Sequence, residues 1–566
     1  MKSLVLGLLF AAALALPADA QITETVAHKH MVAAANPHAA AAGLEMLRAG
    51  GTAVDAAIAT QLVLGLVEPE SSGIGGGAFM LVFDSKSRKT TSFDGREMAP
   101  ASAKPNMFLG PDGNPRGHFD AIPGGLSVGI PGVVGMLGLA HDKYGKLPWA
   151  QLFQPAIKLA ESGFPVGPKL ARTIKNFAPG AKMPDIRAHF YHADGTTLAE
   201  GEIYKNPEYA ASLKKIAAEG PDGFYKGEIA EAIIQAVQHA PGQQGGMTMA
   251  DLANYRAQER SPVCGDYRQY HLCSMGPPSS GGIAVLQILG ELQRFPSSQL
   301  QPGTVSNAHL FSQASKLAYA DRAKYLGDPA FVHVPMAGLI DKNYLRSRAA
   351  LIDPAKDMGT AQAGTPPDEK HARYAPQVSP VLHGTSHLTI VDDAGNVVAM
   401  TTSVEFVFGA EIMAKGFILN NTLTDFSFQP MRDGLPVANA PAPGKLPLSA
   451  MSPTIVFDKD RRFLLSVGSP GGPAIIDYVA QTLSGILDGK MSMKDAIAMP
   501  RELAMNGPTL LENGPGVDKL AAALTAMGHT VQIPSQEGSG LHGIMRVKDG
   551  YIGAADPRRD GIALGD

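Results

Sequence analysis

The pair Gly384-Thr385 stands between a segment rich in Gly, Pro, Ala and charge, residues 355–380, and a predicted strand. A threonine hydroxyl is a weak nucleophile unless a base lies beside it, and a free α-amine on the same residue supplies one. Such an amine has an ordinary pKa of about 7.7–8.0, close to neutral pH. A free amine in mid-chain requires cleavage of the bond before Thr385, and glycine at 384 leaves that carbonyl unshielded. The pair therefore suggests a self-generated N-terminal nucleophile, although the same dipeptide also occurs as an ordinary turn.

The two cysteines of the chain, Cys264 and Cys273, flank a short segment that favours a hairpin. An oxidising compartment would permit a disulfide between them, and the alternative is a pair of free buried thiols. Two cysteines are too few for a structural zinc site. We expect neither to be the nucleophile, and we expect neither a metal nor a cofactor in this protein.

Helical and strand patterns alternate in the first hundred residues. Asn36-Pro37 opens an alanine-rich helix that stops at Gly50-Gly51, and a second, apolar helix is predicted from about Ala53 to Val67. A strand at Ala78–Phe83 follows, with Lys89–Phe93 as its expected partner.

The part of the chain after Thr385 is dominated by paired strands. His387–Asp392 and Val397–Ser403 alternate like the two arms of a hairpin, as do Pro453–Asp458 and Phe463–Val467. A helix is predicted at about Ala474–Leu487. The pattern indicates a β-hairpin layer with a covering helix inside an α+β whole, and it marks residues 355–380 as an exposed linker.

Several short segments spread along the chain form a recognisable set. They are EPESSGIGGG at 68–77, FDGREMAP at 93–100, TSHLTI at 385–390, GNVVAMTTSVE at 395–405, FG at 408–409, NN at 420–421, DFS at 425–427, PLSAMSP at 447–453, GSPGG at 468–472 and GAADPR at 553–558. Together they closely resemble the γ-glutamyltranspeptidase family, in the family's order and over nearly all of the chain after residue 20.

This resemblance implies an Ntn-hydrolase fold, an α+β four-layer αββα sandwich that two subunits form from one self-cleaved precursor. Residues 1–20 would be a signal peptide, 21–384 the large subunit with the linker near its end, and 385–566 the small catalytic subunit. The two subunits would stay associated as a heterodimer after cleavage between Gly384 and Thr385.

The resemblance also implies roles at the reacting centre. The Thr385 hydroxyl would attack a γ-glutamyl carbonyl and form an acyl-enzyme, which water or an acceptor amine then releases. Gly471 and Gly472 match the family's oxyanion hole, where backbone N–H groups face the developing charge. Ser403 stands where the family usually has a second threonine that bonds to the nucleophile, so a hydroxyl is retained.

At the donor's amino-acid end, the matching residues include three that fit the family and two that depart from it. Arg96 matches the arginine that clamps the α-carboxylate, a task suited to a planar fork of donors. Asp425 matches the carboxylate that binds the α-ammonium, and Ser449 a hydroxyl at the α-carboxylate. Glu405 stands where asparagine is commoner, and Ala450 replaces the second of two serines.

Two further departures concern donor specificity. Thr422 replaces a longer Gln or Glu side chain, and residues 429–445, where many members carry a lid, lack tyrosine and tryptophan. The leading function is a γ-glutamyl hydrolase/transpeptidase acting on glutathione and related compounds. A cephalosporin acylase that takes a glutaryl group is the alternative within enzymes, and a catalytically inactive secreted binding protein is the alternative outside them.

Composition and the N-terminus limit the partners. With 45% hydrophobic residues, a formal net charge of −4 and a pI near 6.5, the chain favours small-molecule substrates over nucleic acid. Lys2, the apolar run Leu4–Leu16 and Ala18-Asp19-Ala20 before Gln21 are typical of a signal peptide. The apolar run is shorter than the ~20 residues that a membrane anchor needs. We therefore expect an exported protein, periplasmic or extracellular, with no membrane span.

Overall fold

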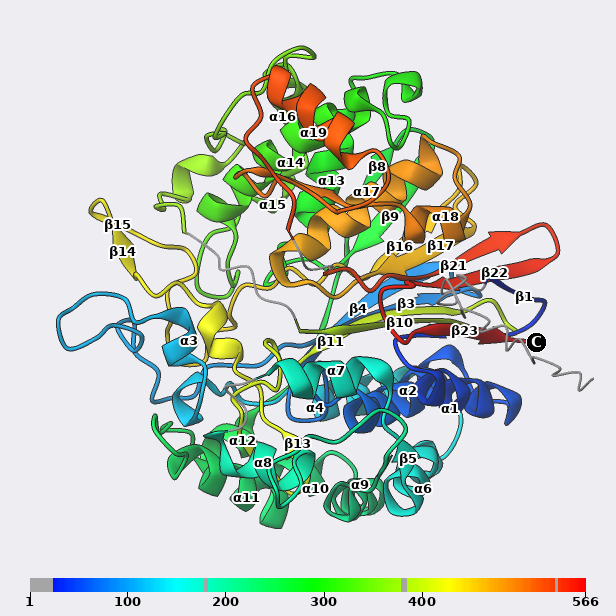
Figure 1. The fold of residues 1–566 in the computed structure, drawn as a ribbon, viewed down its shortest axis with the longest axis vertical. Helices are drawn as coiled ribbons and strands as arrows, with labels where there is room; N and C mark the ends of the chain where they lie inside the picture. The colour runs from blue at the N-terminus through cyan, green and yellow to red at the C-terminus, as the bar shows by residue number, and fades with distance from the viewer. Residues whose placement is uncertain (1–23, 178–181, 378–383, 535–537) are drawn as a thin grey trace, which may run out of the picture.

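Two stacked β-sheets lie between two layers of helices (Figure 1). The computed structural model describes residues 24–177, 182–377, 384–534 and 538–566. The predicted signal peptide, residues 1–20, lies outside the described residues. In this four-layer arrangement each sheet buries one face against helices and the other against the second sheet, as the αββα prediction requires.

The first sheet carries Thr385 at the mouth of a central strand. Its strands are β2 (Met31–Ala34), β3 (Gly77–Asp84), β4 (Lys89–Gly95), β7 (Gln258–Arg260), β10 (Ser386–Val391), β11 (Val397–Ser403) and β23 (Ile562–Gly565). Their order is β23-β2-β10-β11-β3-β4-β7, and every pair is antiparallel. Because β10 is paired on both sides and fully buried, the residue at its start is held firmly.

The second sheet faces the first. Its strands are β1 (Glu24–Ala27), β8 (Val263–Tyr267), β9 (Tyr270–Ser274), β16 (Thr454–Phe457), β17 (Phe463–Gly468), β21 (His542–Val547) and β22 (Gly550–Ala555). They follow the order β1-β22-β21-β17-β16-β9-β8. An apolar layer that includes Ala33, Leu81, Val397, Ile455 and Ile544 fills the space between the two sheets.

Helices cover the outer face of each sheet (Figure 1). Those on the side of the first sheet are α1 (Pro37–Arg48), α2 (Ala53–Val67), α4 (Val133–Tyr144) and α7 (Pro168–Asn176), and those on the side of the second are α13 (Gly281–Leu292), α14 (Val305–Tyr325), α17 (Ile475–Leu487) and α18 (Met493–Ala498). The longer helices of the outer parts are α6 (Gln154–Ser162), α8 (Pro184–Phe190), α9 (Pro207–Glu219), α11 (Gly227–Gln238), α12 (Met249–Asn254), α16 (Lys342–Ala349) and α19 (Val517–Ala526). Separate apolar clusters join each helical layer to its sheet.

Local sequence signals explain where the first helices begin. The Asn36 side chain accepts the N–H of His38, and a proline occupies the first turn of α1. Thr52 and Asp55 form a capping box at the start of α2. Both predicted helices are confirmed, as are the strand pair that follows them and the two pairs after Thr385, with bounds that differ by a residue or two.

The described part of the predicted linker, residues 355–377, contains one 3-10 turn at Glu369–His371. Most of its side chains are exposed, as its composition predicted, but Ala361, Ala372 and Ala375 are buried. The N–H of Ala375 donates to the carbonyl of Pro436 at 2.9 Å, beside the hairpin of β14 (Met431–Arg432) and β15 (Leu435–Pro436). The linker is therefore attached to the body at these alanines, and also at the buried Gln377 and at Asp357, which pairs with Lys316.

Candidate active site

Thr385 is buried and its hydroxyl is hydrogen-bonded to a second hydroxyl. Its Oγ1 lies 2.9 Å from the Oγ of Ser403, which ends β11, and either atom can be the donor. The Ser403 Oγ also accepts the N–H of Glu405 at 2.8 Å, which fixes its rotamer. The strand pairing that opposes Ser386 and Thr402 brings these two hydroxyls together. The structure thus supports an orienting role for Ser403.

The backbone around the expected cleavage point is strained. Thr385 has φ of +85°, a conformation that is costly for a β-branched residue. A Cβ added at Gly384 would lie 2.0 Å from the carbonyl oxygen of Glu405, so only glycine fits there. The N–H of Thr385 donates to the carbonyl of Ser71 at 3.0 Å. Thr385 is therefore held at both its hydroxyl and its nitrogen.

The predicted oxyanion turn comes from the second sheet. Gly471 and Gly472 follow β17 with φ of +134° and +56°, and Gly472 lines the same cavity as Thr385. A Cβ at Gly471 would meet the Tyr478 ring at 2.6 Å, which explains a glycine at this position. The turn leads directly into α17, whose N-terminal end favours negative charge. The two sheets thus contribute opposite sides of one site.

The predicted donor-binding residues form a dense charged cluster in that cavity. Arg96, which follows β4, is buried, and its Nη2 donates to Asp425 at 2.5 Å and to the carbonyl of Leu448 at 3.2 Å. Its Nη1 lies 3.3 Å from Oε2 of Glu97, a fully buried carboxyl whose pKa is raised by burial. The two residues expected to hold the donor's carboxylate and ammonium are therefore paired with each other.

Glu405 stands beside this pair. Its side chain accepts a hydrogen bond from Asn421, and its backbone φ is +81°. Burial raises the pKa of Glu405 well above its ordinary value, and the negative charge of Asp425 adds to the rise. A carboxylate in this position gains most from a cation brought next to it.

Ser449 and Ala450 line the same cavity, as predicted. The Ser449 hydroxyl accepts the N–H of Met451 at 3.1 Å, and its carbonyl accepts both donors of Ser280. Thr422 points elsewhere, because its hydroxyl donates to Glu97 at 2.7 Å. It contacts the glutamate that flanks Arg96 and is not among the residues that line the cavity.

Comparison with known proteins settles the family. The family model for γ-glutamyltranspeptidase matches residues 39–566. The glutathione hydrolase proenzyme of Escherichia coli (strain K12) is 40% identical over 582 residues, covering 99% of this chain and 97% of that protein. That of Bacillus subtilis (strain 168) is 39% identical over 546 residues, covering 94% and 91%. This chain belongs to the γ-glutamyltranspeptidase family.

The fold agrees with that membership. A crystal structure of cephalosporin acylase from Bacillus halodurans superimposes with a TM-score of 0.85 at 28% identity, covering 99% of each chain. The Ntn-hydrolase fold class is therefore confirmed for this γ-glutamyltranspeptidase family member. None of the helices in the described ranges has the length and apolar character needed to cross a bilayer.

One cavity residue of this family member was not identified from the sequence. Arg322, on α14, lines the cavity together with Arg96, and its Nε donates to the Oγ of Ser280 at 2.9 Å. Burial lowers the pKa of Arg322 below its ordinary value. Within α14 it looks like any helical arginine, and only the packing of α14 against the loop around Ser280 brings it to the site.

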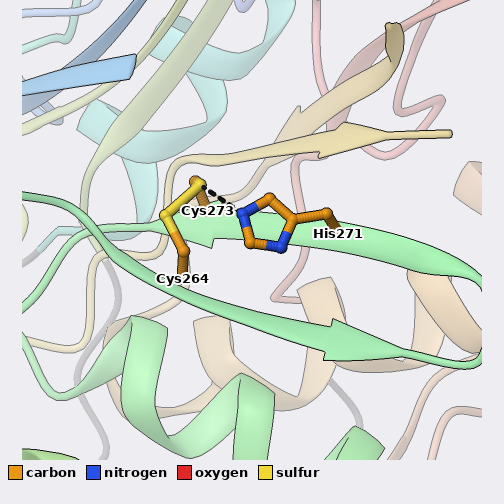
Figure 2. Close-up of side chains that lie close together, drawn as sticks. All are labelled: Cys264, His271 and Cys273. Carbon is orange, nitrogen blue, oxygen red and sulfur yellow. Dashed lines mark hydrogen bonds between the residues drawn. A yellow bond between two sulfur atoms is a disulfide. The ribbon is translucent and has the colours of Figure 1, made fainter. Parts of the chain in front are cut away.

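Cys264 and Cys273 are joined by a disulfide between β8 and β9, at the edge of the second sheet. Figure 2 shows the two bonded sulfurs with His271 beside them, its Nε2 3.6 Å from Cys273. These three side chains have the spacing of a metal-ligand set. Since both sulfurs are bonded to each other, neither is a thiolate ligand. The expectation that neither cysteine is the nucleophile agrees with this placement.

Proposed function

We propose that the protein is a self-processing γ-glutamyl hydrolase/transpeptidase that acts on glutathione and related γ-glutamyl compounds through Thr385. One observation carries the proposal. The Thr385 hydroxyl is hydrogen-bonded to Ser403, its nitrogen donates to Ser71, and Thr385 lines the cavity that contains Arg96, Glu405 and Asp425. A nucleophile and a charged site for an amino-acid group therefore share one cavity.

Maturation uses the strained bond before Thr385. The Thr385 Oγ attacks the carbonyl carbon of Gly384, the C–N bond breaks, and the threonine nitrogen takes up the proton that the hydroxyl loses. Water then hydrolyses the resulting ester, which leaves a Gly384 carboxylate, a free Thr385 hydroxyl and a free α-amine. Relief of the φ of +85° at Thr385 favours this cleavage.

Turnover repeats the attack on a donor. The free α-amine takes the proton of the Thr385 hydroxyl, whose oxygen attacks the γ-carbonyl of the donor. The N–H groups at Gly471 and Gly472 stabilise the oxyanion, and the amine passes its proton to the leaving nitrogen. Water or an acceptor amine then releases the γ-glutamyl group from Thr385 by the same route.

Donor binding exchanges one ion pair for two. In the structure Arg96 and Asp425 neutralise each other at 2.5 Å. A γ-glutamyl group brings a carboxylate for Arg96 and an ammonium for Asp425 and Glu405. Each protein charge then keeps an opposite partner, which limits the desolvation cost of the exchange.

A glutaryl-type acylase is the second candidate, because the cephalosporin acylase shares the fold over the whole chain. A glutaryl group carries the carboxylate but lacks the ammonium. It would occupy Arg96 and leave Glu405 and Asp425 facing each other without a cation. The charges of the cavity therefore favour the γ-glutamyl donor.

A panel of matched γ-glutamyl, glutaryl and α-glutamyl anilides tests the proposal. We expect the highest kcat/KM for the γ-glutamyl anilide and two protein bands on a denaturing gel. A preference for the glutaryl anilide would establish the acylase function instead. A single inactive band would support a binding protein.

We also propose that the two chains remain a heterodimer and that the protein is exported. β10 of the small chain pairs with β2 of the large chain, and β11 with β3, which supports continued association after cleavage. The pattern of residues 1–20 supports export. Cell fractionation followed by N-terminal sequencing of the large chain tests it, with Gln21 as the expected first residue.

A further inference from the structure

A lysine ammonium is buried against Ser71, the residue whose carbonyl accepts the N–H of Thr385. Lys169, in the first turn of α7, is 8% exposed, and its Nζ lies 2.5 Å from Glu70 Oε1, 3.1 Å from Glu68 Oε1 and 2.8 Å from Ser71 Oγ. Its backbone N–H donates to Asp560 at 3.1 Å, which fixes the start of the helix. A buried lysine with three acceptors has a defined position.

Two of these acceptors, Ser71 and Glu68, are hydrogen-bonded to Thr385 or to the residue after it. The carbonyl of Ser71 accepts the N–H of Thr385 at 3.0 Å and that of Val404 at 3.1 Å. The second oxygen of Glu68 accepts the hydroxyl of Ser386, the next residue along the chain, at 2.8 Å. Lys169 therefore contacts both the residue whose carbonyl holds the Thr385 nitrogen and the carboxylate that holds the side chain of Ser386.

We propose that Lys169 is a positioning residue for the α-amine of Thr385, acting through Ser71 and Glu68. This inference rests on the proposed function, in which that nitrogen becomes the catalytic base. The Ser71 carbonyl accepts one N–H of the amine and directs its lone pair toward the Thr385 hydroxyl. Small displacements of such a base reduce the rate strongly.

The charges around Lys169 predict how its loss would shift the pKa of the Thr385 α-amine. Glu68, Glu70 and Asp560 face it, with Arg172 near Asp560, and His542 lies near Glu68. Burial lowers the pKa of His542 to about 4, so it is neutral at pH 7. Lys169 thus pairs with Glu68 and Glu70, and Glu68 in turn accepts the hydroxyl of the residue next to Thr385. Without it, the uncompensated carboxylates favour the protonated amine and raise its pKa.

The test compares Lys169→Met with Lys175→Met, an exposed lysine on the same helix. For Lys169→Met we expect self-cleavage and kcat to fall about tenfold or more, with KM for the γ-glutamyl anilide within about twofold of wild type. The acid limb of the kcat/KM profile moves to higher pH. Lys169→Arg restores part of the rate, since it keeps the charge and the donors. The Lys175→Met control behaves as wild type.

Wild-type rates in Lys169→Met would overturn the proposal, as would a lower kcat with an unmoved acid limb and no recovery in Lys169→Arg. If Lys169→Met does not fold, Ser71→Ala decides, because it removes one lysine contact and keeps the carbonyl. A severalfold slower self-cleavage supports the proposal, and an unchanged rate rejects it. Self-cleavage needs no donor, so a wild type without γ-glutamyl activity rejects the proposed function alone.

Discussion

The reacting centre and the donor end of the cavity consist of different kinds of chemical group. At the centre, Thr385 is hydrogen-bonded to the hydroxyl of Ser403 and the carbonyl of Ser71, and Gly472 lines the same cavity, so these groups are all neutral. At the donor end, Arg96 is packed among the carboxylates of Glu97, Glu405 and Asp425. One end is defined by backbone geometry and the other by charge.

This difference indicates how each end of the cavity should respond to pH and to substitution. Backbone positions depend on strand register and glycine conformations, which are fixed by the whole fold. Charge pairs respond to pH and to each substitution, because every buried charge depends on its partners. We therefore expect changes at the centre to abolish the chemistry, and changes at the donor end to alter affinity and choice of donor.

The largest effect is expected for Thr385→Ala, which removes the nucleophile. The protein should stay a single chain, and activity toward the γ-glutamyl anilide should fall at least about 10⁴-fold. Thr385→Ser is the matched control, since it keeps a hydroxyl and should still self-cleave. Gel analysis and initial rates measure both. Processing of the alanine variant would show that another residue is the nucleophile.

The next effect is expected for Gly471→Ala. The added Cβ would collide with the Tyr478 ring at 2.6 Å, and alanine is strained at φ of +134°. Displacement of the oxyanion donors should lower kcat about 10²–10³-fold. In the control Gly514→Ala, the new Cβ lies 3.9 Å from its nearest neighbour and kcat should not change. Equal kcat in both variants would contradict an oxyanion role for this turn.

At the donor end, Arg96→Lys keeps the charge but loses the planar fork that reaches Asp425 and the Leu448 carbonyl. Loss of one charged hydrogen bond corresponds to about a 10–100-fold rise in KM for the γ-glutamyl anilide. Self-cleavage should continue, because the role proposed for Arg96 is to bind the donor. The exposed Arg172→Lys serves as control. An unchanged KM in Arg96→Lys would remove this residue from the donor site.

Glu405→Gln tests the donor end through the pH dependence of its affinity for the donor. Because burial raises the pKa of Glu405, its carboxylate forms only as pH rises through that value, and affinity for an ammonium donor should rise with it. The glutamine variant should lose this pH dependence and reduce the preference for γ-glutamyl over glutaryl anilide about tenfold. Profiles of KM against pH for both donors measure it. An unmoved ratio would mean that Glu405 does not recognise the ammonium.

The smallest effect on activity is expected at the disulfide, which lies at the sheet edge. Replacing both Cys264 and Cys273 by Ser should leave kcat and KM unchanged. Opening this short loop should lower the free energy of unfolding by about 2–3 kcal/mol. Urea unfolding curves with and without a reductant test the stability part. A loss of activity in the folded variant would contradict the separation of this edge from the site.

Much of this structure is encoded locally. Asn36-Pro37, the capping residues Thr52 and Asp55, and the alternation on either side of residues 393–396 predict their elements because caps and hairpins depend on neighbours in sequence. The glycine–threonine pair at a strand mouth suggested a nucleophile but left an ordinary turn open, so the assignment of Thr385 rested on the family resemblance. The resemblance to a family supplied the rest of the expected site.

Long-range pairings were not predictable. The Arg96–Asp425 pair, the placement of Arg322 beside it and the contact of Lys169 with Ser71 join residues far apart in sequence. Their geometry depends on how whole helices and sheets pack. The buried alanines of the linker were missed for a related reason, since composition does not show which small side chains the body covers.

The most direct test of self-cleavage before Thr385 is N-terminal sequencing and intact mass of the two chains of the purified wild-type protein. We predict that the large chain ends at Gly384 and that the small chain begins at Thr385 and runs to Asp566. A small chain that begins at any other residue, or a single uncleaved chain that still hydrolyses the γ-glutamyl anilide, would contradict it.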